Sequence, residues 1–316
     1  MEVLIAKQSQ KDKEAENGYK KLEFTSFGLK PNVETTTSQT INTTGFQKDS
    51  WVSKIDVNGD LTLESSYGQL EFFIENGGFK KKEEPLSPSQ NKSEYIADNQ
   101  FDKYLTCILE DNENASCDIF KGLLINTLKL ETSLASYVNL NVGFVGQDSE
   151  VKNSASGKSN AITTFEGDPL ICLGAEITEN ENEKNTSKIE SLSIDINNSL
   201  QGKGALNSVY NKTIKRTGLR NVNINFTYNE FDKEGYTNAF KSLKENSTYK
   251  VKVEFKEVKK SNEKGHKITL EFPKCKVSNI ERTNITADMG MSKSIQALYD
   301  EKIKSPVIIT FEKPSK

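Results

Sequence analysis

The order of the predicted secondary structure repeats along the chain, and this repeat constrains the fold more than any other feature of the sequence. Apolar and polar side chains alternate over residues 56–64 (DVNGDLTLE) and again over residues 221–229 (NVNINFTYN). Such alternation is typical of a β-strand with one buried face. A helical pattern follows each of these strands, and more alternating segments follow each helix. Two unrelated β-rich halves would share the alternation but not this order, so we interpret the chain as a duplication of one unit.

Each copy of the unit contains one predicted short helix. In the first copy, residues 65–78 (SSYGQLEFFIENGG) open with two serines that can cap a helix, carry apolar residues at helical spacing and end in two glycines. In the second copy, Asp232 is the predicted N-cap. The apolar face of this second helix consists of Tyr236, Ala239, Phe240 and Leu243.

Alternating segments elsewhere predict further strands, and the polar segments between them predict loops. Residues 22–29 and the Thr-rich residues 33–45 are expected to be extended. Residues 80–100 are charged and contain Pro and Ser, which predicts a surface loop. Residues 146–161 are rich in Ser, Asn, Lys and Gly, which predicts a linker. The other predicted strands are residues 104–110, 118–124, 125–131 and 137–145 in the first half, and residues 189–196, 249–255, 268–272, 276–280 and 306–311 in the second.

These elements predict a mainly β fold. Because the loops are short and the strands alternate, we expect antiparallel sheets arranged as two tandem β-sandwich or small-barrel modules, each with one short α-helix. The linker predicts a boundary between a first module at residues 1–160, which includes the 80–100 loop, and a second module at residues 161–316.

Composition argues against tight nucleic-acid binding and against a metal centre. The formal net charge is −3, and the only arginines are Arg216, Arg220 and Arg282, so there is no basic surface suited to gripping phosphates or reading bases. One histidine cannot build a multi-histidine metal site. The four cysteines have no CxxC spacing, and we expect four small thiols that are buried or half-buried in strands.

Motifs for enzymatic chemistry are absent from the sequence. It contains no phosphate-binding loop, dinucleotide fingerprint, HExxH helix or GxSxG elbow, so neither a catalytic residue nor a cofactor is predicted. His266 follows Lys264 and Gly265 at a predicted turn. We expect a solvated turn histidine there rather than a catalytic one, since no orienting partner can be named.

Membrane and secretion signals are also absent. Residues 1–7 (MEVLIAK) are too short for the apolar core of a signal peptide, and no segment approaches the length of a membrane helix. The sequence therefore predicts a soluble protein made in the cytoplasm, without a membrane partner.

Three segments together carry a family resemblance. They are residues 51–78 with their strand and helix, residues 121–147 with a closing strand pair, and residues 191–240 with the second strand and helix. In this order they resemble the major tail tube proteins of long-tailed bacteriophages, in the group whose members have two tube-like halves. The resemblance spans residues 1–312, and it rests on strand patterns rather than on an active-site signature.

The resemblance implies a structural subunit that assembles with copies of itself into rings, and rings that stack into a hollow tube. Double-stranded DNA would pass through this tube without tight binding, which suits an acidic chain. Three chains with two modules each would form a pseudo-sixfold ring, and six chains are the alternative. The implied partners are further copies of the chain, a tape-measure protein and a tail-terminator protein. The implied location is the virion tail, assembled in the host bacterial cytoplasm.

Two segments are the implied arms between rings. By position in the chain they are residues 31–49 and residues 197–217. The residues expected to make contacts there are Thr35, Thr36, Thr37, Thr40, Thr43, Phe46, Trp51, Asn207, Tyr210 and Thr213. Trp51 precedes a predicted strand and is expected to be an interface or core residue.

Other functions stay open at this point. The inner tube of a contractile injection system or of a prophage particle would have the same sequence pattern, and a neighbouring sheath gene would separate it. A surface adhesin or carbohydrate-binding β-sandwich would normally carry a secretion signal and clustered aromatic residues. An enzyme is the remaining class.

Overall fold

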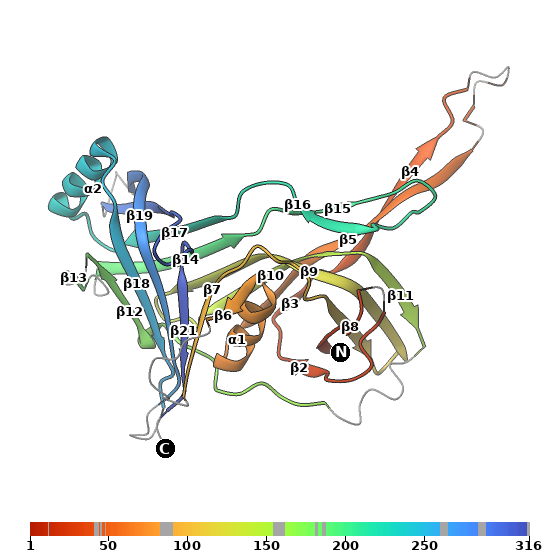
Figure 1. The fold of residues 1–316 in the computed structure, drawn as a ribbon, viewed down its shortest axis with the longest axis horizontal. Coiled ribbons are helices and arrows are strands. Elements are labelled where there is room, and N and C mark those ends of the chain that lie inside the picture. The colour runs from red at the N-terminus through yellow and green to blue at the C-terminus, as the bar shows by residue number, and fades with distance from the viewer. Residues whose placement is uncertain are drawn as a thin grey trace.

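The structure is a computed structural model that describes residues 1–11, 13–40, 44, 46–47, 49–82, 91–153, 162–180, 183–184, 188–259, 265–283 and 289–314. These residues are mainly β-strand, and the sheets are antiparallel, which confirms the predicted fold class. The described part of the chain holds two α-helices, one in each half. Figure 1 shows α1 in front of the sheets and α2 at the far end of the molecule from a projecting hairpin.

The strands of the first half are β1 Glu2–Lys7, β2 Lys20–Leu22, β3 Ser26–Phe27, β4 Lys30–Thr37, β5 Ser50–Glu64, β6 Phe79–Lys81, β7 Lys92–Ala97, β8 Leu105–Asp111, β9 Ser116–Ser133, β10 Asn139–Gly146 and β11 Asp148–Lys152. Those of the second half are β12 Ala175–Glu179, β13 Glu183–Lys184, β14 Ile189–Asn197, β15 Leu200–Lys203, β16 Thr213–Arg216, β17 Asn221–Tyr228, β18 Tyr249–Lys256, β19 Lys267–Thr283, β20 Gly290–Ala297 and β21 Ile308–Glu312. The helices are α1 Tyr67–Asn76 and α2 Lys233–Glu245, and one 3-10 turn, η2, spans Cys172–Gly174.

Seven of the described strands form one continuous layer, which we call the wall sheet. Its strand order is β5-β10-β9-β14-β17-β20-β19, and every neighbouring pair is antiparallel. The pairing of β9 with β14 joins the two halves of the chain, and Leu130 lies opposite Ile194 at this junction. Both side chains are buried in one core that spans the two halves. The wall sheet therefore runs without interruption from the first half of the chain into the second.

The same pairing pattern occurs twice in the wall sheet. The trio β5-β10-β9 in the first half corresponds to the trio β17-β20-β19 in the second. A register shift leaves Asn126 as an extra residue in β9, and an equivalent shift leaves Ser278 as an extra residue in β19. A β-bulge is a specific local feature. Because it occurs at the same place in both trios, the residues of one trio correspond one to one with the residues of the other.

Helix α1 forms as predicted. Ser66 is its N-cap, with a capping box in which the Ser66 hydroxyl accepts from the Gln69 N–H at 3.4 Å and the Gln69 side chain accepts from the Ser66 N–H at 3.0 Å. The helix ends at Gly77, and Leu70, Phe73 and Ile74, which are among the apolar residues at helical spacing, are buried. A cap of this kind stabilises a helix by about 1 kcal/mol.

Helix α2 forms where predicted, and its predicted apolar face is partly buried. Asp232 accepts a hydrogen bond from the Gly235 N–H at 2.9 Å and caps the helix as expected. Of the predicted face, only Ala239 is buried, and Phe240 is 43% exposed. Tyr236 and Leu243 are half-buried, and Tyr236 packs against the core, so the predicted face turns toward β19 while α2 lies at one end of the molecule.

Several predicted loops and breaks were wrong. The predicted 80–100 loop contains β7, which pairs with β6 and with β21 from the other end of the chain, while residues 83–90 lie outside the described residues. The predicted 146–161 linker contains β11, which pairs with β9, and residues 154–161 are not described. Each of β9 and β19 is one long strand rather than two, because each strand continues from one sheet layer into the next. The thiols of Cys107, Cys117 and Cys275 are buried and that of Cys172 is half-buried, which confirms the expectation for the cysteines.

Candidate assembly surface

The first predicted arm is a two-stranded ribbon that projects from the body. We define the arm as β4, residues 38–49 and the first part of β5 up to Ile55. Its strands pair in register, with Thr36 opposite Trp51 and Thr37 opposite Ser50. Figure 1 shows it extending past the rest of the molecule. A two-stranded ribbon with no core face is marginally stable in water by itself.

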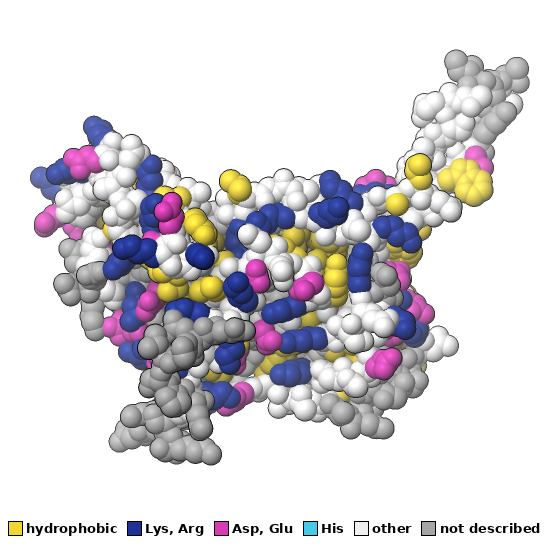
Figure 2. Space-filling model, in the orientation of Figure 1, with side chains coloured by type: hydrophobic (Ala, Val, Ile, Leu, Met, Phe, Trp, Pro, Cys, Tyr) yellow, Lys and Arg dark blue, Asp and Glu magenta, His cyan; other side chains and the backbone are white. Residues whose placement is uncertain are grey.

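The arm exposes hydrophobic side chains. Val33 is 55% exposed, Val52 47% and Trp51 72%, and Figure 2 shows hydrophobic side chains gathered on the arm beyond the body. Trp51 is therefore not a core residue of the chain. Exposed apolar groups on a projecting ribbon are typical of a protein–protein contact surface.

The predicted arm residues have the following environments. The side chains of Thr35, Thr36 and Thr40 are exposed, Phe46 is exposed, and Thr37 is half-buried. Thr43 lies outside the described residues. The threonine-rich strand therefore places most of its side chains where a second molecule can reach them.

The second predicted arm is the hairpin of β15 and β16, whose connecting loop lies against the base of the first. The Ile55 N–H donates to the Val209 carbonyl at 2.7 Å, and the Asn211 side chain donates to the Asp56 carboxylate at 2.9 Å. Tyr210 forms an isolated bridge with Ile55 and is half-buried. The structure thus brings Tyr210 to the base of the first arm. Asn207 is exposed in the loop, and Thr213 is half-buried in the hairpin opposite Lys203.

Sequence reasoning did not identify the polar face of the wall sheet. The residues that alternate with the core residues all point to this face, where Asn139, Asn141, Ser193, Asn225 and Ser294 lie in neighbouring strands. The sequence does show polar residues between the apolar ones in each predicted strand. However, the pattern of one strand does not indicate which other strands lie beside it and share this polar face. The charged residues of this face include the carboxylates Asp56, Asp60, Glu64, Glu131, Asp195 and Glu281 and the lysines Lys54, Lys129 and Lys276, with Lys30 and Glu34 of the adjoining β4 on the same side.

One charge pair crosses the junction between the halves on this face. Lys129 of β9 lies opposite Asp195 of β14, and its Nζ is 2.7 Å from the Glu131 carboxylate. Burial raises the pKa of Asp195, and the charge of Lys129 offsets part of this effect. The face is therefore polar and carries more carboxylates than lysines.

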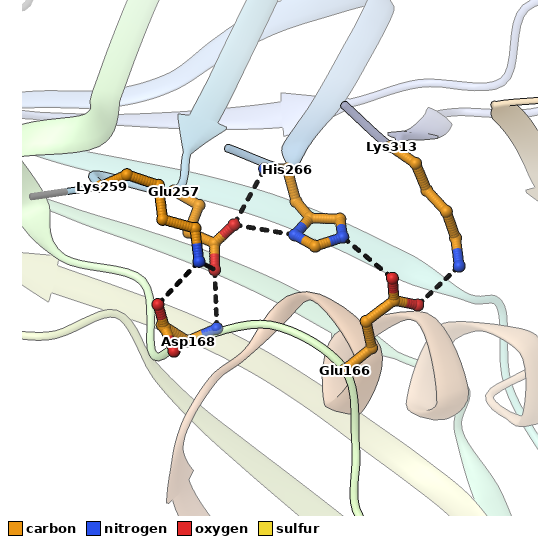
Figure 3. A network of polar contacts seen from close by, with 6 residues as sticks. All are labelled: Glu166, Asp168, Glu257, Lys259, His266 and Lys313. Atoms are coloured by element: carbon orange, nitrogen blue, oxygen red, sulfur yellow. Dashed lines mark hydrogen bonds and ion pairs between the residues drawn. The ribbon is translucent and has the colours of Figure 1, made fainter. Parts of the chain in front are cut away.

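His266 is buried rather than solvated, so that prediction was wrong. Its Nδ1 lies 2.7 Å from the Glu257 carboxylate, its Nε2 lies 3.2 Å from Glu166, and its ring packs on Tyr67 with centroids 4.3 Å apart. Figure 3 shows the ring held between the two carboxylates. Both ring nitrogens have partners, which suits a structural rather than a catalytic role.

Glu257 is the centre of this network. Its carboxylate accepts from the backbone N–H groups of His266 at 2.9 Å and Asp168 at 2.7 Å, and from Lys259 at 2.8 Å. Burial alone would raise the pKa of Glu257, but these hydrogen bonds outweigh it and lower the pKa to about 2. The network connects residues 166–168, near the start of the second half, to the end of β18 and the start of β19.

We expect Glu257→Gln to lower the free energy of unfolding by about 3 kcal/mol at pH 7, because a folded-state pKa well below the ordinary value stabilises the charged form. This contribution is present above the ordinary pKa of 4.5 and is lost as the pH falls toward about 2. Urea denaturation from pH 7 to pH 3 measures it, with Glu271→Gln on the exposed side of β19 as the matched control. Equal stability of the two variants at pH 7 would contradict the role given to Glu257.

The described residues contain no group of three potential metal ligands, and none of their helices is long and apolar enough to cross a membrane. They present a projecting arm, open sheet edges and a polar sheet face, which is the combination expected of a structural assembly subunit. The model of the phage tail tube protein family matches residues 2–256. The chain therefore belongs to the phage tail tube protein family, which makes it a structural component of the virion tail. A comparison with curated proteins found no match.

Proposed function

We propose that the chain is the subunit that self-assembles into the stacked hollow rings of a phage tail tube, through which the genome is delivered. The observation that carries the proposal is the wall sheet. One of its faces packs on the core, and the other is continuous, polar and richer in carboxylates than in lysines. A surface of this kind suits a lumen wall, because it offers DNA few cations to hold its phosphates.

The assembly we propose uses the two halves of the chain as modules, residues 1–160 and residues 161–316. Three chains then form a ring with six similar modules, and six chains are the alternative. The arm and the β15–β16 hairpin reach the adjoining ring, where the exposed Trp51 and Val52 become buried. A tape-measure protein inside the tube and a tail-terminator protein at its end complete the set of partners, and assembly takes place in the cytoplasm of the host bacterium. The role has no catalytic step.

The first experiment is negative-stain electron microscopy of the purified full chain, with light scattering on the same sample. We expect hollow rings or tubes, and the ring mass divided by 35.4 kDa gives the number of chains. A chain that stays monomeric at high concentration, even when tail-tip proteins are added as an initiator, contradicts the proposal. Glycan binding by such a monomer would favour a carbohydrate-binding β-sandwich instead.

A further inference from the structure

Strands β3 and β4 extend the wall sheet beyond β5, and the sheet extended in this way has two edges with no partner within the described residues. One is the outer edge of β19 beyond Cys275, since residues 276–283 pair only with β20. The other is the outer edge of residues 24–32, where β3 and β4 pair only with β5. Open edges are ready sites for pairing with another chain. The Gly28 N–H bonds inward to the Asp60 carbonyl, so the backbone groups of Leu29 and Pro31 point outward, where both offer a carbonyl and Leu29 alone an N–H.

The repeat identifies the strand in the other half of the chain that corresponds to each open edge. Lys129 of β9 lies opposite Asn141, which lies opposite Thr62. Glu281 of β19 lies opposite Ser292, which lies opposite Thr227. Thr62 and Thr227 hold the same place in the matching strands 56–64 and 221–229. The open stretch of β19 is therefore the equivalent of the part of β9 that pairs with β14, and Glu281 is the equivalent of Lys129.

The other open edge is the equivalent of β14. Leu192 of β14 lies opposite Phe226, and Phe27 of β3 lies opposite Leu61, which holds the matching place in the first half. By the same register Lys30, opposite Asn58, is the equivalent of Asp195, opposite Asn223. Within the chain the β9 edge is covered by β14, whereas the β19 edge and the β3–β4 edge are both left open.

We infer that residues 28–32 of one copy pair with residues 279–283 of β19 in a second copy, in the register of the β9–β14 junction. This inference rests on the proposed function and names the partner edges of the ring. It places Lys30 opposite Glu281 and Leu29 opposite Arg282, and it extends the wall sheet from one chain to the next.

The charges support this register. In the junction within the chain, the β9 residue is Lys129 and the β14 residue is Asp195. In the junction between chains both signs are reversed, so Glu281 of β19 meets Lys30, and the pair stays complementary. Both side chains are exposed and both lie on the polar face, since Glu281 pairs with Ser292 and Lys30 with Asn58.

The opposite face of the same edges supports it as well. The Arg282 guanidinium lies 4.8 Å from the ring centroid of Phe231 and 5.2 Å from that of Tyr236, and the Tyr236 ring stacks on the exposed Phe240 of α2. In the inferred register Arg282 lies beside Leu29 of the next chain, which is buried in the core of that chain, so the apolar layers of the two chains adjoin at this edge. A face of this kind is expected at an interface with a second copy.

A disulfide cross-link tests the register directly. At the internal junction the Leu134 N–H donates to the Glu190 carbonyl, and the Asn198 N–H donates to the Asn126 carbonyl. Even-numbered β14 residues thus bond to β9, and Asp195 belongs to a non-hydrogen-bonded pair. The equivalent pair of Lys30 and Glu281 would have Cα atoms about 4.5 Å apart, within reach of a disulfide.

The experiment compares Lys30→Cys/Glu281→Cys with Lys30→Cys/Glu301→Cys, both in the full chain with Cys172→Ser under mild oxidation. We expect reducible dimers and larger species on a non-reducing gel for the first variant only. If rings form by electron microscopy and neither variant cross-links, the edge pairing is wrong while the proposed function stands. If the chain forms no rings even with an initiator, the proposed function itself fails.

Charge reversal provides a second readout that does not depend on cysteine chemistry. We expect Lys30→Glu and Glu281→Lys each to raise the concentration needed for ring formation at least about fivefold, since like charges then face each other. The double variant is expected to return it to within about twofold of the original. If the double variant assembles no better than either single variant, Lys30 and Glu281 are not opposite one another.

Discussion

Removal of the arm is expected to abolish tubes while leaving the subunit folded. The change replaces residues 35–53 by Asn-Gly, which joins Glu34 to Lys54, a directly opposed pair, through a tight hairpin turn. The arm projects from the body, and most of its described side chains are exposed. We therefore expect the free energy of unfolding to change by no more than about 0.5 kcal/mol. Electron microscopy would show single rings in place of stacked tubes.

A single substitution in the arm tests whether its side-chain contacts, and not only its length, are needed for the stacking of rings. Trp51→Ala removes the largest exposed side chain of the arm, and buried aromatic anchors of this kind contribute about 2–4 kcal/mol to an interface. We expect tubes to form only at higher protein concentration, with Val151→Ala, an exposed apolar residue of β11 away from the arm, as the control. Normal tubes from the shortened chain would show that rings stack through some other surface.

Reversal of charge on the polar face is expected to make the tube retain DNA. Asp60→Lys/Glu64→Lys places cations on β5 without disturbing the core, since both residues alternate with the buried Leu61 and Leu63. Each phosphate that such a lysine contacts adds about 0.9 to the slope of log affinity against log salt. We expect assembled rings of this variant to bind double-stranded DNA at low salt and to release it steeply as salt rises.

The neutral variant Asp60→Asn/Glu64→Gln separates the gain of cations from the loss of carboxylates. We expect it to bind DNA far more weakly than the lysine variant, and electron microscopy would verify that both assemble. In a phage that carries the lysine variant, genome delivery should slow while particle yield stays normal. DNA binding that is the same for all three proteins would place the polar face outside the lumen.

Local patterns predicted much of the fold. The two serines and two glycines around residues 67–76 were enough to predict α1, because caps act on the nearest turn. The alternation of residues 56–64 and 221–229 gave β5 and β17 with their buried faces. β7 was missed because its partner, β21, is at the far end of the chain and its own pattern is only partly apolar. β20 was also missed, because one of the buried positions in its alternating pattern is occupied by Lys293, and its sequence therefore looked polar.

The candidate surface was predicted only in part. The position of the arms followed from the resemblance to a family, and Thr36 and Trp51 do lie on a projecting ribbon. The polar face was not predicted, because it exists only once seven strands from both halves lie side by side. The burial of His266 was missed for a related reason. Its partners Glu257 and Glu166 lie 9 and 100 positions away, and no local pattern links them.

The two halves carry unlike hairpins at matching places, since the long arm is built from β4 and the first part of β5, while the shorter β15–β16 hairpin lies between β14 and β17. In a ring of three chains, six similar modules would thus bear long and short hairpins in turn. Rotation of one ring against the next by 120° would place long hairpins on the sites of long hairpins, so the rings would fit. Rotation by 60° would place long hairpins on the sites of short ones, so the rings would not fit. Unequal hairpins would give such a tube a fixed rotational phase from ring to ring, which a ring of six identical single modules could not impose.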